Sequence, residues 1–125
     1  MSRILLDTHS FVWWVEAHPR VRSTWLDLVL DEGNTTYVSA VTGWEIETKK
    51  RIKKIEFDGD VGAVAGQFGF ELLSVTMSHA ALAGALDWGH RDPFDRMLVA
   101  QAIENDMTLL SADDVMKSAP GVRVL

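Results

Sequence analysis

The chain has 125 residues, and 47% of them are hydrophobic. One domain commonly takes about 100–200 residues, so we expect a single domain over residues 1–125 with enough apolar side chains for a core. Cysteine is absent, which excludes disulfides, zinc-thiolate centres and a cysteine nucleophile. Any metal must therefore be bound by oxygen or imidazole.

The charge balance is acidic, with 12 Lys and Arg against 18 Asp and Glu, a net charge of −6. This balance argues against a protein that coats nucleic acid through clustered positive charge. An acidic chain can still act on a phosphate polymer if divalent cations mask its carboxylates.

No segment has the composition of a membrane span or a signal peptide. The apolar stretch Ile4-Leu5-Leu6 ends at Asp7, and nothing approaches the roughly 20 apolar residues that cross a bilayer. We therefore expect a cytoplasmic protein without a membrane partner.

Apolar periodicity and turn residues predict alternating strands and helices. The expected strands are residues 3–6, 35–38, 71–75, 108–110 and 122–125. The expected helices are residues 10–17, 21–31, 40–55, 61–68, 79–86 and 93–105. This alternation is typical of an α/β fold with a parallel sheet of four or five strands and helices on both faces.

Acidic residues stand where this fold would gather them at one edge of the sheet. Asp7 follows the first strand, and Glu45 lies in the second turn of the helix after the second strand. Asp92 and Asp95 open the helix that leads into the fourth strand, which Asp113 follows. Because strand ends and the starts of following helices share one edge, we expect these five side chains to meet there.

Carboxylates gathered in this way repel one another, and such a cluster usually persists because cations bind it. Oxygen ligands favour hard ions, so Mg²⁺ or Mn²⁺ is the expected cofactor. Such an ion lowers the pKa of a bound water and stabilises phosphoryl displacement. The implied reaction is hydrolysis of a phosphodiester bond.

Each acid also has a structural interpretation. Asp7 could cap a helix, and Glu45 has Lys49 four residues later, the spacing of an ordinary helical ion pair. Asp92 before Pro93 is typical of a helix cap, with Asp95 as its capping-box partner.

The segment after the fourth strand has its own capping pattern. Ser111 as cap with Asp114 as its partner would leave Asp113 free to bind a ligand.

The remaining polar and aromatic residues give weaker indications. We expect the histidines to lie mostly at the surface or behind the site, although His9 and His90 adjoin acids and could touch substrate. We expect most of the five tryptophans in the core, with one or two in the first two helices facing a partner protein. The basic run consists of Lys49, Lys50, Arg51, Lys53 and Lys54. It is either a solvated helix face or a surface that leads an RNA backbone toward the acids.

Four blocks of sequence, in order along the chain, resemble PIN-domain proteins, and most closely the VapC-type toxins of bacterial toxin-antitoxin pairs. The blocks are LLDTH at 5–9, VSAVTGWEI at 38–46, HRDPFDRMLVAQA at 90–102 and LLSAD at 109–113. The resemblance implies a flavodoxin-like parallel sheet and an endoribonuclease that depends on Mg²⁺ or Mn²⁺. It also implies a homodimer and inhibition by a VapB-like antitoxin.

Carried over by position, the four acids of the family fall on Asp7, Glu45, Asp95 and Asp113. These are the expected metal ligands and catalytic residues. Auxiliary roles fall on Thr8, Ser111 and Asp92, and expected RNA contacts on Lys49, Lys50, Arg51 and Lys53.

Two other function classes remain as alternatives. A receiver-type phosphoacceptor domain has a similar size, but it needs paired acids after its first strand and a lysine after a late strand, and neither is present. A PIN-like module that binds RNA or protein without cutting it would not need all four acids.

Overall fold

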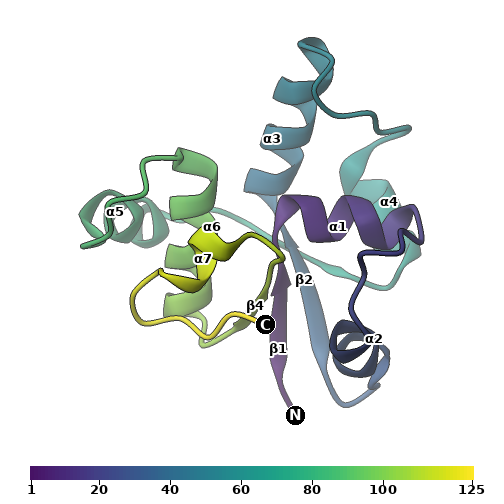
Figure 1. The fold of residues 1–125 in the computed structure, drawn as a ribbon, viewed down its shortest axis with the longest axis horizontal. Helices are drawn as coiled ribbons and strands as arrows, with labels where there is room; N and C mark the ends of the chain where they lie inside the picture. The colour runs from purple at the N-terminus through teal and green to yellow at the C-terminus, as the bar shows by residue number, and fades with distance from the viewer.

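The computed structural model describes all residues from 1 to 125, built around a four-stranded parallel sheet (Figure 1). The strands are β1 (Arg3–Leu6), β2 (Thr35–Ser39), β3 (Glu71–Leu73) and β4 (Thr108–Leu110), in the spatial order β3-β2-β1-β4. The central strand β1 pairs with both β2 and β4, so that Leu5 stands opposite Tyr37 on one side and Leu109 on the other. The predicted α/β class and parallel sheet are confirmed.

The sheet is apolar on both faces because helices cover both. Ile4 and Leu6 of β1 belong to one core cluster and Leu5 to the other, as expected when alternate side chains point to opposite faces. All three are fully buried, which explains the continuous apolar run in the sequence.

Helices α1 (Thr8–Val15), α2 (Ser23–Leu30) and α4 (Val61–Gln67) cover one face. Helix α6 (Pro93–Glu104), with α5 (Met77–Ala85) packed on it, and the short α7 (Asp114–Lys117) cover the other face. Helix α3 (Ala40–Arg51) follows β2 directly and contributes Ile46 to the first core and Val41 to the second. In Figure 1, α1 and α3 lie beyond the carboxyl ends of β1 and β2.

Several predicted boundaries are wrong. The expected strand at 122–125 forms only one bridge, between Leu109 and Val124, and the strand expected at 71–75 ends at Leu73. The helix expected to reach residue 55 ends at Arg51, because Lys53 adopts a left-handed conformation (φ 58°). The N–H of Lys54 then donates to the carbonyl of Lys49 (2.9 Å) and closes the helix end.

Most of the histidines and tryptophans are buried or exposed as expected, and His79 and Trp44 are the exceptions. His79 is only 5% exposed, because α5 begins at Met77 and places His79 where it forms a capping box with Thr76. Of the five tryptophans only Trp25 is fully buried, and Trp44 of α3 is 57% exposed. No helix combines the length and the apolar character that crossing a bilayer requires.

Candidate active site

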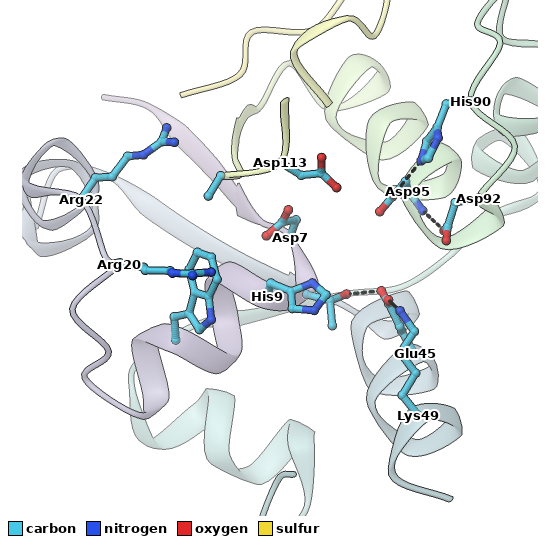
Figure 2. Close-up of a pocket in the computed structure, with 13 residues that line it drawn as sticks. Asp7, His9, Arg20, Arg22, Glu45, Lys49, His90, Asp92, Asp95 and Asp113 are labelled. Atoms are coloured by element: carbon cyan, nitrogen blue, oxygen red, sulfur yellow. Dashed lines mark hydrogen bonds and ion pairs between the residues drawn. The ribbon is translucent and has the colours of Figure 1, made fainter. Parts of the chain in front are cut away.

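A pocket of about 680 Å³ opens at the carboxyl ends of the strands. All five acids that the sequence placed at this edge line it, namely Asp7, Glu45, Asp92, Asp95 and Asp113. In Figure 2, Asp7 lies near the centre, with Asp113, Asp95 and Glu45 around it on three different parts of the chain. The parallel sheet therefore brings these side chains together from segments that lie far apart in sequence.

Asp7 lies between β1 and α1, where it both caps the helix and lines the pocket. Its Oδ1 accepts a hydrogen bond from the N–H of Ser10 (2.9 Å), while its own N–H donates to the carbonyl of Leu110 in β4 (3.1 Å). The residue is only 6% exposed. Burial raises the pKa of this carboxyl, and hydrogen bonds from Ser10 and Ser111 oppose the rise only in part.

Glu45 is 3% exposed and has two partners. Thr8 donates a hydrogen bond from Oγ1 to Glu45 Oε1 (2.6 Å), which holds α1 against α3. Lys49, one turn further along α3, forms an ion pair with Oε2. The helical pair anticipated from the spacing exists, and it lies inside the pocket rather than on a solvated face.

Asp92 and Asp95 stand at the start of α6. The side chain of Asp92 caps the helix by accepting from the N–H of Asp95 (3.0 Å), with Pro93 at the first helical position, so the expected cap is confirmed. The Asp95 side chain instead contacts His90, with 2.7 Å between Oδ2 and Nε2. Burial, with the nearby charges of Asp92 and Glu45, raises the pKa of Asp95 to about 6 despite the hydrogen bond to His90.

One arginine organises the loop that carries His90, and sequence reasoning missed it. The Arg96 guanidinium donates to four carbonyl oxygens at 2.7–2.9 Å. These belong to Ala83, Leu86, Trp88 and His90. Arg96 follows Asp92 by four residues, a spacing that favours an ion pair at the helix surface. No local pattern therefore indicates that Arg96 binds the carbonyl oxygens of this loop.

Asp113 does have a capping role, contrary to expectation. Helix α7 begins at Asp114, and the side chain of Asp113 caps it by accepting from the N–H of Val115 (3.2 Å). Ser111 is fully buried and accepts from the N–H of Asp113 (3.1 Å), so it supports the cap instead of being one. The exposed carboxylate of Asp113 still faces the pocket (Figure 2).

The basic run contributes only Lys49 to this pocket. Lys50 pairs with Glu47 (3.4 Å), and Lys50 and Lys53 border a separate cavity of about 570 Å³. Two cations that the sequence did not single out, Arg20 and Arg22, line the acidic pocket instead.

The donor chemistry of the pocket fits a hard cation. Its acidic side chains offer only oxygen, and buried Asp7 has no cationic partner among the ion pairs of the structure. No three acidic or histidine side chains converge on one point in the manner of metal ligands. Glu45 is instead paired with Lys49, and Asp95 contacts His90.

Comparisons with known proteins agree with this architecture. A family model described as the PIN domain matches residues 4–122. The chain is 28% identical over 121 residues to Ribonuclease VapC22 of Mycobacterium tuberculosis, a match that covers 94% of this chain and 92% of that protein.

Solved structures share the fold at low sequence identity. A chain of the DNA-bound VapBC2 of Rickettsia felis superposes with a TM-score of 0.72 at 17% identity, covering 98% of this chain and 97% of that one. A chain of the DNA-bound VapBC of Salmonella typhimurium gives a TM-score of 0.73 at 17% identity, covering 100% of this chain and 98% of that one.

Proposed function

Because this chain belongs to the PIN-domain family, we propose that it is a divalent-metal-dependent endoribonuclease, formed by one domain over residues 1–125 and acting as the toxin of a VapBC-type pair. Family membership removes the receiver-type alternative. The name of the mycobacterial relative, a ribonuclease, supports RNA as the substrate class. The structural neighbours, which are chains of toxin-antitoxin complexes, support a VapB-like antitoxin as partner, and we expect a homodimer.

The observation that carries this proposal is the position of Asp7. Burial of this carboxylate raises its pKa and costs free energy that its helix cap alone does not offset, in a pocket that four other acids line. A cation at this point would relieve that cost. The site therefore has the character of one selected for ligand binding at the expense of stability.

In this proposal Asp7 and Asp95 are the principal metal ligands, and Glu45 and Asp113 complete the acidic set. A bound Mg²⁺ or Mn²⁺ would supply a water of lowered pKa and neutralise charge on the phosphate. VapC ribonucleases of the PIN family are in general dependent on a divalent metal, while the choice of Mg²⁺ or Mn²⁺ is part of the proposal.

Contacts with the surrounding side chains orient these carboxylates. Thr8 orients Glu45 through its 2.6 Å hydrogen bond, and His90 orients Asp95 through the 2.7 Å contact between Nε2 and Oδ2. Lys49 balances the charge of Glu45 when no cation is bound. When substrate binds, its phosphate would attract the ammonium group of Lys49. Buried Ser111 positions the backbone of Asp113.

The direct test is cleavage of total RNA by the purified protein in Mg²⁺ or Mn²⁺, with cut ends mapped. Activity should disappear with EDTA, and Asp7→Asn should lower it by at least about a hundredfold while the circular dichroism spectrum is kept. Asp27→Asn, which removes an exposed carboxylate on α2, is the matched control and should cleave normally.

Two results would contradict the proposal. Cleavage that survives EDTA would exclude the metal role. Metal-independent RNA binding with no cleavage in either ion would favour the PIN-like binding module.

A further inference from the structure

We propose that Arg20 and Arg22 form a phosphate-binding subsite for single-stranded RNA on the side of the pocket opposite Glu45 and Asp95. We call this pair the arginine wall. The inference rests on the proposed nuclease function and adds to it a substrate contact that lies outside the acidic set. In this inference the arginine wall binds the phosphate next to the one that is cut.

The arginine wall belongs to the same pocket as the acids. Both arginines line the cavity, and in Figure 2 they lie on the far side of Asp7 from Asp95 and Glu45. They come from the loop between α1 and α2 and from the residue before α2. A strand of RNA with one phosphate at the acids would therefore pass these guanidinium groups.

Each guanidinium is held against a tryptophan. Arg20 lies over Trp13, 5.5 Å from the ring centroid, and Arg22 lies over Trp25 at 5.4 Å. Trp25 is fully buried, and its Nε1 donates to the carbonyl of Leu125 (3.1 Å), so the platform under Arg22 is rigid. Contacts with aromatic rings restrict the arginine side chains before any ligand binds.

His18 supports both the Trp13 ring, over which Arg20 lies, and Arg20 itself. The ring of His18 stacks on that of Trp13, with centroids 5.4 Å apart and 21° between the planes. His18 Nδ1 accepts from the backbone N–H of Arg20 (3.0 Å). His18 thus holds the backbone of Arg20, and Trp13 of α1 holds its side chain.

Neither arginine is neutralised by a carboxylate. The pocket holds five acids in a chain of net charge −6, yet no Asp or Glu oxygen lies within 4.0 Å of either guanidinium. Lys49, the third cation of the pocket, is by contrast paired with Glu45. Unpaired guanidinium groups keep their hydrogen-bond donors free for an anion.

The chemistry of guanidinium favours phosphate as that anion. Its planar set of N–H donors matches two phosphate oxygens at once, and its charge does not depend on pH. Such contacts position a nucleic acid without reading its sequence. The arginine wall would therefore attract RNA to a pocket whose carboxylates otherwise repel it.

The test measures RNA binding and cleavage separately. Binding of a 5′-fluorescein-labelled single-stranded RNA of mixed sequence is followed by anisotropy in Mg²⁺, with Asp95→Asn in every protein to prevent cleavage. Arg20→Ala and Arg22→Ala should each weaken binding by about tenfold. Each should also reduce the slope of log affinity against log salt concentration by about 0.7.

Cleavage by proteins with native Asp95 gives the second readout. Each alanine variant should raise KM by about tenfold and change kcat by less than about twofold, because the contact is made equally in substrate and transition state. Arg20→Lys should restore the salt slope, since the charge is kept, but only part of the affinity.

The matched control is Arg123→Ala, which removes the same charge from a cavity that Ser2 and Thr108 line at the amino ends of β1 and β4. It should leave affinity and salt slope unchanged. Because Arg22 packs on a buried ring, Arg22→Gln provides a second variant if Arg22→Ala unfolds.

The outcomes separate the two hypotheses. If the native protein cleaves RNA but the arginine variants bind like Arg123→Ala, the arginine wall is wrong and the nuclease stands. If the native protein neither binds nor cleaves RNA, both proposals fail. Competition by polyglutamate as strong as that by RNA would indicate a carboxylate-binding site and overturn the RNA assignment.

Discussion

Replacing Asp95 with Asn should make the metal-free protein more stable while it abolishes RNA cleavage. The pKa of Asp95 is raised from 3.8 to about 6, so the folded protein holds this carboxylate ionised at a cost above that pH. A difference of this size corresponds to at most about 3 kcal/mol at pH 7. The Asp95 side chain is 22% exposed, and solvent screening reduces the expected gain to about 1–2 kcal/mol.

The sign of the pH dependence follows from the direction of the shift. Well below the ordinary pKa of 3.8 the carboxyl is protonated in both the folded and the unfolded chain, so the native protein and the Asp95→Asn variant should be equally stable. As the pH rises from about 4 to 6, only the unfolded chain releases its proton, and the native protein loses stability relative to the variant. Above pH 6 the difference should stay constant.

Thermal unfolding followed by circular dichroism in EDTA checks this prediction. At pH 7 the midpoint of Asp95→Asn should lie roughly 3–8 °C above that of the native protein, and the gap should close by about pH 3. Burial raises the pKa of Asp7 in both proteins, so its contribution cancels in the comparison. Added Mg²⁺ should stabilise the native protein more than the variant.

An Asp95→Asn protein less stable than the native one at pH 7 would refute the reasoning. It would mean that the contact with His90 stabilises the ionised carboxylate by more than burial destabilises it. A gap that does not depend on pH would exclude titration of Asp95 as the cause. Asp27→Asn should show no gap at either pH.

Three further predictions test the surroundings of the site. Thr8→Val removes the 2.6 Å hydrogen bond to the buried glutamate of α3 and should lower RNA cleavage by about tenfold with the fold retained; unchanged kinetics would leave this hydroxyl without a role. Arg96→Ala removes four hydrogen bonds to carbonyl oxygens and should lower the free energy of unfolding in urea by about 2–4 kcal/mol; a loss below about 0.5 kcal/mol would contradict the part assigned to this side chain. Replacing Lys50, Arg51 and Lys53 together with Ala should reduce the salt slope of RNA binding by about 2, and an unaltered slope would return the basic run to a solvated helix face.

The sequence by itself determined the class of fold and the edge at which the acids gather. Apolar strands that alternate with helices require a parallel sheet, and in such a sheet every strand end and following helix start lies at one edge. Asp7 after β1 and Glu45 after β2 are therefore brought to that edge by topology alone. The cap at Asp92 could be predicted as well, because Asp before Pro acts within a single helical turn.

Only the tertiary structure decided which partners each side chain meets. Arg96 donates hydrogen bonds to carbonyl oxygens of the loop before α6. Arg22 lies over Trp25, whose indole N–H donates to the carbonyl of Leu125 at the other end of the chain. The cap at Asp113 likewise depends on tertiary packing, because Ser111 is buried and α7 begins only at Asp114. Local propensity and periodicity report on residues within a turn or two of one another. Contacts between remote segments depend instead on how whole helices pack, and a single sequence carries no local pattern that reveals them.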